Sequence, residues 1–426
     1  MRALSVSATL FLFVAFTVCA VGEEPTTTHL QAAVPTPLTA LLDEASSHSP
    51  EIQAAVYGYQ AARNVSKAAG ALPDTQVFAQ SLSVGSPRPL AGYTNSDFAY
   101  IGVGASQQIP FPGKRGLRSE VARHQASALE ADAESVKRRV LQQVKMAYFQ
   151  LAYLQATLGI LQRDNRLLGD IEQIAESRYR VGQGNQQEVL RAQLQHTKIL
   201  QEITMHHQQV GAFNAELKRL LGRSQDSRDI TTDLLVPRSL SYTNTQLLEF
   251  AVKQNPEIQS SEENAESASS QVTLAQREFR PDFNVQYMYQ NTGPKFRDYY
   301  MATLGINLPN RGRRRAELAQ AEEKHNQAAE NAQAARQKIL AAVQDRYVFI
   351  TTSQEQLNIY QGGLIPQSQA SLRSAMDSYQ SNRQDFQTLL ASFLDVLSLE
   401  TEYQRQLAEH ESAMAELESL TGVTLQ

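Results

Sequence analysis

In this 426-residue chain, the only cluster of side chains that could bind a soft metal ion is the run Met205-His206-His207. Imidazole and thioether groups are ligands for copper, zinc and related ions. The run falls in a stretch of helical periodicity, where adjacent positions point about 100° apart, so the three side chains do not converge on one ion. We therefore interpret the run as part of a solvated helix face and expect no metal site.

Two glycine-containing runs partly match phosphate-binding loops. Gly182-Gln183-Gly184 lacks the third glycine and the preceding strand of a dinucleotide loop, and Pro112-Gly113-Lys114 lacks the upstream glycine of a phosphate loop. Charged pairs such as Glu130 and Glu134 lie at helical spacing and are expected on a solvated face, not in an acid–base pair. We therefore expect no catalytic residues and no cofactor, and the chain is predicted not to be an enzyme.

Residues 1–22 have the features of a secretory signal peptide. A basic residue precedes an apolar run from Ala8 to Ala20, and small residues follow it. The apolar run is too short for a spanning helix, and no later stretch offers about 20 apolar residues. We therefore expect residues 1–22 to be removed and the mature chain to be secreted.

Cysteine content and net charge further limit the kinds of site that the mature chain could contain. Cys19 is the only cysteine, so the mature chain can hold no internal disulfide and no thiolate metal cluster. Val18 is a poor residue before a lipid-modified cysteine, so we expect cleavage near Gly22 without acylation, with acylation of Cys19 as the alternative. The formal net charge of −5 gives no reason to expect nucleic-acid binding.

The longest stretch of helical periodicity runs from about 114 to 180. Its small or apolar residues recur about every 3.5 residues, the period of a coiled-coil seam, and Asn165 takes one turn of that spacing. A helix of about 65 residues would be roughly 100 Å long, more than a globular domain needs. A return helix from about 186 would end at Gly222, a favourable C-cap.

The pattern of a long helix followed by a return helix occurs twice along the chain. Asn255-Pro256-Glu257 matches Ser49-Pro50-Glu51, and after the strands the offset settles at 200 residues, so that Gly422 falls on Gly222. We divide the chain into a signal peptide (1–22), a flexible N-terminal arm (23–37), a first repeat (38–222), a linker (223–243) and a second repeat (244–426). Strands are expected at about 74–84, 98–109, 282–290 and 299–308, and helical hairpins at about 114–221 and 312–421.

Local signals refine the helices within these repeats. A short helix is expected over 38–47, and a second one from Pro50 to about Ala71 with Ser49 as its N-cap. Pro366 should kink the second long helix, because its ring clashes with the preceding turn.

The strands of the second half show the clearest alternation. Apolar residues occupy every second position of 283–289 and of 300–308, and polar or small residues, with two methionines, occupy most of the others. Uncharged strands of this length with one apolar face and aromatic ends are typical of a transmembrane barrel, although a half-buried sheet in a soluble domain is the alternative. Four strands cannot close a barrel, so several chains would have to contribute to one barrel.

These residues resemble the TolC-type outer-membrane factor family over roughly residues 38 to 422. The resemblance rests on the two-fold repeat, on the Ser/Asn-Pro-Glu-Ile-Gln pair, and on the segments IPFPGKRGLRSEVARHQA (109–126) and YQSNRQDFQTLLASFLDVL (379–397). Those two segments are most similar to the outer-membrane components of heavy-metal efflux systems. The resemblance implies a mainly α fold with a small transmembrane β portion. It also implies a homotrimer with a twelve-strand barrel and a periplasmic α-helical tunnel.

The resemblance also implies a function and partners. The chain would be the outer-membrane exit duct of a tripartite efflux system in a Gram-negative bacterium. It would work with a periplasmic adaptor and an inner-membrane resistance-nodulation-division pump, and its cargo would be heavy-metal cations. The same duct could serve drugs or a secreted protein, and a different class is a structural periplasmic coiled-coil protein or adaptor.

Three groups of residues are candidate sites within this interpretation. Adaptor docking is expected at the two hairpin turns, and acidic residues beside the second turn would narrow the tunnel entrance, as in relatives. Gln183 departs from the leucine that many relatives carry. Basic residues at the starts of the long helices oppose the helix dipole and should lie at the membrane boundary, bound to acidic lipid groups or to a neighbouring protomer. The turn residues are Val181, Gly182, Gln183, Gly184, Ser381, Asn382 and Arg383; the entrance residues are Asp377, Tyr379 and Asp385; the basic residues include Lys114, Arg115, Arg118, Arg311, Arg313, Arg314 and Arg315.

Overall fold

The computed structural model describes residues 35–293 and 297–425, which belong to one compact unit starting at Pro35. The predicted signal peptide, Cys19 and most of the predicted arm lie outside the described residues. In chain order the elements are α1 (Leu38–His48), α2 (Pro50–Ala69), β1 (Gln76–Leu82), β2 (Tyr100–Ile109), α3 (Lys114–Arg180), α4 (Gln186–Leu221), α5 (Asn244–Gln254), α6 (Pro256–Arg277), β3 (Asp282–Asn291), β4 (Tyr299–Asn307), α7 (Arg311–Ile359), the π-helix η1 (Tyr360–Leu364), α8 (Ile365–Gln380) and α9 (Phe386–Thr421).

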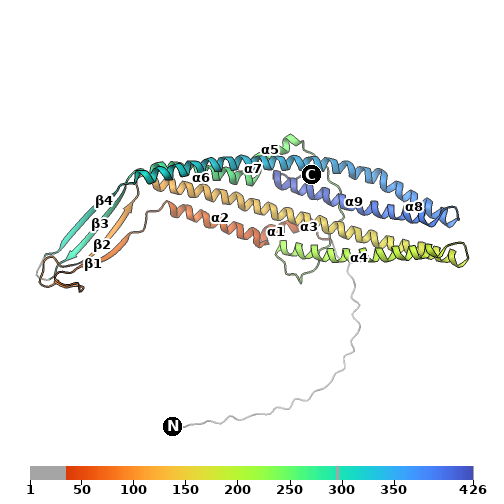
Figure 1. Ribbon diagram of the computed structural model, residues 1–426, viewed down its shortest axis with the longest axis horizontal. Helices are drawn as coiled ribbons and strands as arrows, with labels where there is room; N and C mark the ends of the chain where they lie inside the picture. The colour runs from red at the N-terminus through yellow and green to blue at the C-terminus, as the bar shows by residue number, and fades with distance from the viewer. Residues whose placement is uncertain (1–34, 294–296, 426) are drawn as a thin grey trace, which may run out of the picture. The chain divides into compact units, whose positions relative to one another are not determined.

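The four strands form one antiparallel sheet in the order β1-β2-β3-β4 (Figure 1). Its register places the apolar residues of all four strands opposite one another: Leu304 pairs with Val285, and Tyr287 pairs with both Ala302 and Ala105. Ala105 in turn pairs with Val77, so this face continues across β1. The first-half strands, whose alternation is weaker in the sequence, therefore extend the same apolar face.

The helices continue from the sheet as two hairpins. The first is α3 with α4, and the second is α7, η1 and α8 with α9; the two hairpin turns lie at the end opposite the sheet (Figure 1). A hydrophobic cluster near the turns, here called the tip cluster, draws its buried side chains from both hairpins. Its buried members are Leu161, Leu168, Ile171, Ala175, Ala192, Ile199, Leu372, Ala375, Tyr379, Phe386, Leu389, Phe393, Val396 and Leu397.

The two long helices differ in continuity. The first, α3, runs through 67 residues without interruption, whereas the second is interrupted by the five-residue π-helix η1. Pro366 follows directly, at the second position of α8. Proline has no N–H to donate and its ring crowds the carbonyl four residues earlier, here that of Gly362, so the hydrogen-bond ladder widens into a π-turn. The predicted disturbance therefore takes the form of a π-helix.

The two short helices that start at proline also differ. Ser49 stands at the N-cap of α2, but its side chain makes no capping hydrogen bond, contrary to our expectation. The matching Asn255 does cap α6, because its side chain accepts from the N–H groups of Glu257 and Ile258. The second repeat therefore has the better-formed cap.

Candidate functional site

The backbone of the two hairpin turns is the same in both repeats. Gly182 and Asn382 each adopt a left-handed conformation, with φ of 73° and 58°. In each turn this residue donates its N–H three residues back, and the next residue, Gln183 or Arg383, donates five residues back. This is the Schellman arrangement, which satisfies carbonyl groups left open at the end of a helix. The α4 and α9 helices then start at capping residues, Asn185 and Asp385.

Arg178, near the end of α3, joins the two turns to each other. Its guanidinium donates to the carbonyl of Tyr379 and to the Asn382 Oδ1, 2.5 Å away, and it lies 4.4 Å from the centre of the Tyr379 ring. It also donates to the carbonyl of Gln183 in its own turn, at 3.2 Å. One cation of the first hairpin thus binds both turns.

Tyr379 completes this junction from the second hairpin. Its hydroxyl donates to Glu188 of α4 at 2.8 Å, and its ring packs against Phe386. Burial, with the Glu188 carboxylate beside it, raises the pKa of the Tyr379 hydroxyl, which therefore stays a donor. Only 1% of Tyr379 is exposed, so within this chain the residue that we expected at the tunnel entrance is enclosed between the two hairpins.

The other residues predicted at the second turn are exposed. Asp377, Ser381 and Arg383 face solvent in this chain, and the Arg383 Nε donates to the Ser381 hydroxyl at 2.8 Å. Asp385 is exposed as well, but it also has a local structural role. It accepts from the backbone N–H and the hydroxyl of Thr388, and these hydrogen bonds lower the pKa of the Asp385 carboxyl.

The first turn exposes apolar side chains. Val181 is 69% exposed and Tyr179 is 46% exposed, and Leu190 on α4 is also exposed. Gln183 is exposed too, while its backbone takes part in the turn. The first turn therefore offers an apolar surface, whereas the second offers hydroxyl, amide and charged groups.

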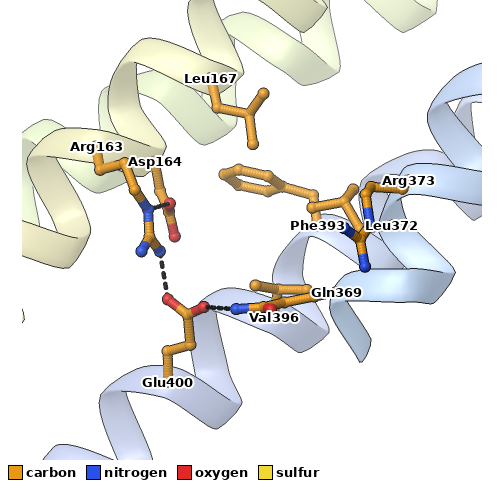
Figure 2. Close-up of a pocket in the computed structure, with 9 residues that line it drawn as sticks. All are labelled: Arg163, Asp164, Leu167, Gln369, Leu372, Arg373, Phe393, Val396 and Glu400. Atoms are coloured by element: carbon orange, nitrogen blue, oxygen red, sulfur yellow. Dashed lines mark hydrogen bonds and ion pairs between the residues drawn. The ribbon is translucent and has the colours of Figure 1, made fainter. Parts of the chain in front are cut away.

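A polar cluster lies between the two hairpins, beside Leu372, Phe393 and Val396 of the tip cluster (Figure 2). The Arg163 Nε donates to the Asp164 Oδ1 at 2.8 Å, and its Nη2 pairs with Glu400 of α9. Gln369 of α8 donates to the other oxygen of Glu400 at 2.6 Å. Asp164 is 3% exposed, and its burial raises the pKa of its carboxyl. The cluster borders a cavity of about 270 Å³ whose other walls include Leu167, Leu372 and Phe393.

The sequence analysis did not identify this cluster. We gave one seam position of α3 to Asn165, whereas the structure buries Asp164 between Leu161 and Leu168. A polar residue interrupting an apolar seam was the available signal, but only the helix rotation decides which polar side chain is buried. Arg163 and Glu400 gave no signal, because charged residues are common along exposed helix faces.

The basic residues at the helix starts are largely paired within the chain. Lys114 is 1% exposed, and its Nζ lies 3.0 Å from Glu278 and 2.9 Å from Asp282. Arg314 also pairs with Glu278, and Arg115 donates to the carbonyl of Gly70. The expectation that Lys114 binds lipid or a neighbouring protomer was therefore wrong. Lys114 joins the start of α3 to the start of β3.

The start of α7, next to the sheet, nevertheless has exposed cations. Arg311, Arg313 and Arg315 are all exposed at the start of α7, and Arg313 pairs with Glu317 one turn later. They follow Leu308, which continues the exposed apolar positions of β4. An apolar surface thus gives way to a cationic one within a few residues.

The three potential metal ligands on α4 do not converge on one point. His206 contacts Tyr153 and the carbonyl of Glu202, and Met205 and His207 are exposed. Within residues 35–293 and 297–425 there is no group of three histidine, cysteine or acidic residues placed to hold a metal ion. The same residues contain no helix both long and apolar enough to cross a membrane.

Comparison with protein families gives a match to the outer membrane efflux protein family over residues 41–223 and 247–420. The chain belongs to this family. The break in the match falls in the region of the predicted linker, between the two repeats. Family membership identifies the chain as an outer-membrane efflux protein, and thus as a transport protein and not an enzyme. No curated protein matches the chain.

Solved structures of outer-membrane channels have the same fold. The channel OprN matches with a TM-score of 0.80 at 17% identity, covering 90% of this chain and 89% of its own. VceC from Vibrio cholerae gives 0.76 at 20% identity, covering 91% and 97%, and CusC gives 0.79 at 19% identity, covering 91% and 92%. These likenesses confirm a mainly helical fold with a small β portion.

Proposed function

We propose that this outer membrane efflux protein is a trimeric exit duct that conducts heavy-metal cations out of the cell. The observation that carries the duct is the four-stranded sheet. It has one continuous apolar face, including Val77, Val285 and Leu304, and it is joined to two long helical hairpins. A sheet with such a face is suited to contact with lipid, while its other face, with Gln286 and Thr303, is suited to water.

The edges of the sheet support assembly. Within residues 35–293 and 297–425, the order β1-β2-β3-β4 leaves one edge of β1 and one edge of β4 without a strand partner. Unpaired backbone groups are not tolerated in hydrocarbon, so β4 of one copy would pair with β1 of the next. Three copies, as the resemblance implies, would close a barrel of twelve strands. Light scattering of detergent-extracted protein should give the mass of a trimer, and a stable folded monomer would contradict this assembly.

The hairpin turns are the proposed contact with a periplasmic adaptor, which would link the duct to an inner-membrane resistance-nodulation-division pump. The exposed Val181 and Tyr179 of the first turn support an apolar adaptor contact. Val181→Asp should weaken adaptor binding, because it places a charge in that contact. The matched change Ser381→Asp, at the polar second turn, should have a smaller effect. Equal loss from both would argue against a distinct role for the first turn.

The cargo is inferred from the resemblance of residues 109–126 and 379–397 to metal-efflux components. The exposed carboxylates Asp377 and Asp385 support passage of cations, because a trimer would place three of each around the entrance. Deleting the gene should sensitise cells to metal ions more than to dyes or detergents. Equal sensitivity to all three, or sensitivity to dyes alone, would move the cargo to drugs.

The entrance itself can be tested in planar bilayers. Asp377→Asn combined with Asp385→Asn should reduce cation selectivity and weaken block by trivalent cations, because both depend on converging negative charge. Unchanged selectivity and block in an intact trimer would exclude these two residues from the entrance without removing the duct.

The exposed arginines at the start of α7 are proposed to contact anionic lipid headgroups. They immediately follow the exposed Leu308, so an apolar sheet edge and a cationic surface adjoin. Arg311→Gln with Arg315→Gln should reduce co-purification of anionic phospholipid, whereas Arg336→Gln, on the same helix but away from the sheet, should not.

A further inference from the structure

The cavity of Figure 2 has polar groups at its two ends and an apolar middle. It lies between α3, α8 and α9 and has a volume of about 270 Å³. Asp164 of α3 and Arg373 of α8 lie on opposite sides of the Phe393 ring (Figure 2). Pockets for drug-sized ligands have volumes of roughly 300–1,000 Å³, so this cavity suits a somewhat smaller molecule. The apolar walls are formed by Leu167, Leu372, Phe393 and Val396.

The α3 end of the cavity has an excess of negative charge. Arg163 pairs with both Asp164 and Glu400, so one guanidinium serves two carboxylates. Both oxygens of Glu400 are bonded, whereas the Asp164 Oδ2 is buried and has no hydrogen-bond partner among the described residues. Burial raises the pKa of the Asp164 carboxyl despite its bond to Arg163, so a further cation beside it would stabilise its charged form. This oxygen is therefore suited to accept a hydrogen bond from a cationic donor.

The α8 end of the cavity has a cation available. Arg373 lines the cavity, is exposed, and forms no ion pair within residues 35–293 and 297–425. A guanidinium binds a carboxylate through two parallel hydrogen bonds. The Arg163 side chain on the other wall is 51% exposed, so the cavity is open to solvent in this chain. The cavity thus offers an acceptor at one end and a free donor at the other.

The walls of this cavity are held in place by other contacts between the same two hairpins. Leu372, Phe393 and Val396 also belong to the tip cluster, which contains residues of both hairpins. Closer to the turns, Arg178 of the first hairpin binds the carbonyl of Tyr379 of the second. These contacts hold α3 against α8 and α9, so the cavity is preformed and a ligand can bind without any movement of the hairpins.

We propose that this cavity binds a small zwitterion of the ω-amino acid class, with an amine and a carboxylate at opposite ends of an apolar chain. The ammonium group donates to the Asp164 Oδ2 and compensates the excess negative charge at that end. Arg373 binds the carboxylate, and the methylene chain lies against Leu167 and Phe393. A diamine would bring a second cation to Arg373, and a dicarboxylate would bring a carboxylate to Asp164, so charge disfavours both. This inference goes beyond the proposed duct and does not rest on it.

A series of ligands tests the two ends separately. Dissociation constants would be measured by ligand-observed NMR titration of full-length protein in detergent, with 6-aminohexanoate as the reference ligand. Hexanoate has no amine and should bind about tenfold more weakly, since it leaves the Asp164 Oδ2 without a donor. Hexylamine has no carboxylate and should bind about threefold more weakly, since an exposed ion pair contributes less. The shorter 4-aminobutanoate and the longer 8-aminooctanoate should both bind more weakly than the best length, because the two ends of the cavity are fixed.

Two variants assign the ends to residues. Asp164→Asn keeps the shape of the side chain and removes its charge, so it should weaken 6-aminohexanoate and hexylamine alike, by about tenfold. Arg373→Gln should weaken 6-aminohexanoate about threefold and leave hexylamine unchanged. The matched controls are Asp170→Asn and Arg166→Gln, because both residues are exposed on α3 and neither lines the cavity. A loss of folding alone could not weaken one ligand and spare the other.

Several results would overturn the site. Wild-type protein that does not bind 6-aminohexanoate would mean that the Asp164 Oδ2 bonds to water only. Equal affinities for 6-aminohexanoate, hexylamine and hexanoate, or equal weakening of both amines by Arg373→Gln, would contradict binding at two ends. Should Asp164→Asn fail to fold, the ligand series on the wild type and Arg373→Gln still decide the proposal. A wild-type protein that conducts no ions would contradict the duct, while the binding measurements would be unaffected.

Discussion

The two hairpin turns have the same backbone conformation, but the side chains around one turn are exposed and those around the other are enclosed. Position 179 and position 379 are equivalent by the 200-residue offset, and both hold tyrosine. Tyr179 is exposed at the first turn, whereas Tyr379 is enclosed by Arg178, Glu188 and Phe386. The difference arises because the first hairpin supplies Arg178 and Glu188 to the second turn, whereas no described residue encloses Tyr179 in this way.

This asymmetry separates two tasks that the sequence repeat alone would assign to both turns. The second turn is held by the first hairpin, so its position depends on contacts within the chain. The first turn keeps an apolar surface available, including Val181 and Leu190. The two repeats therefore share the turn geometry, while the side chains determine which turn is held by the other hairpin and which keeps an exposed apolar surface.

Replacing the two equivalent tyrosines by alanine should give the largest difference in local stability between the two turns. Tyr379→Ala removes a buried aromatic ring and should cost about 3 kcal/mol of local stability, as large-to-small changes in cores do. Tyr179→Ala should change it by less than about 0.5 kcal/mol, as is usual at exposed positions. Hydrogen exchange at the two turns measures both, and comparable losses of protection would contradict the asymmetry.

A smaller effect is expected from the arginines of the first hairpin. Arg178→Ala removes hydrogen bonds to both turns and should cost about 2 kcal/mol, in the range of charged hydrogen bonds. Arg180 pairs with Glu176 on its own helix, so Arg180→Ala should cost about 0.5 kcal/mol at most. The decisive readout is exchange at the second turn, which should rise in Arg178→Ala and stay unchanged in Arg180→Ala.

Replacing the two left-handed residues, Gly182 and Asn382, should give effects on stability that differ by about 1 kcal/mol. Gly182→Ala places a side chain at a φ of 73° and should destabilise the first turn by roughly 1–2 kcal/mol. Asn382→Gly should relieve a smaller strain, but it also removes the oxygen that accepts from Arg178. We therefore expect no net gain in the wild type and a gain of about 0.5 kcal/mol when Arg178 is already alanine. Thermal unfolding of the single and double variants would show whether these two effects separate.

Much of the fold could be predicted from hydrophobic periodicity and from the positions of proline and glycine. Helical spacing, proline and glycine positions indicated two hairpins with turns at 181–185 and 380–384, and alternation indicated the sheet. The π-helix was foreseen only as a kink, because Pro366 disturbs a helix without specifying how the hydrogen bonds rearrange. The strand register could not be predicted either, because it depends on which residues of distant segments pair.

The sites were harder to predict, because they depend on helix rotation. Lys114 reads as an exposed cation at a helix start, yet two acids 164 and 168 residues later enclose it. Tyr379 reads as a turn residue like Tyr179, yet a neighbouring arginine covers it. Spacing along one helix cannot report a partner on another helix, and this is why the polar cluster around Glu400 also went unrecognised.

The smallest difference between the turns concerns their helix caps and depends on pH. The first cap, Asn185, is neutral at all pH values, whereas the second, Asp385, is a carboxylate. Hydrogen bonds from Thr388 lower the pKa of Asp385 in the folded chain relative to the unfolded chain. A lowered pKa means that the cap's contribution is fully present above the unfolded value of about 3.9 and is lost as pH falls through the folded value.

Acidification should therefore loosen the start of α9 while leaving the start of α4 unchanged. Hydrogen exchange of Thr388 and its neighbours, corrected for the intrinsic rate at each pH, should show falling protection below about pH 4, near the ordinary pKa of aspartate. Asp385→Asn converts the second cap into the first and should abolish this dependence, because asparagine accepts the same hydrogen bonds without titrating. If protection at α9 still fell with pH in Asp385→Asn, a group other than the Asp385 cap would be responsible. The two caps would then be equivalent, and the asymmetry between the repeats would lie entirely in the contacts of Arg178 and Tyr379.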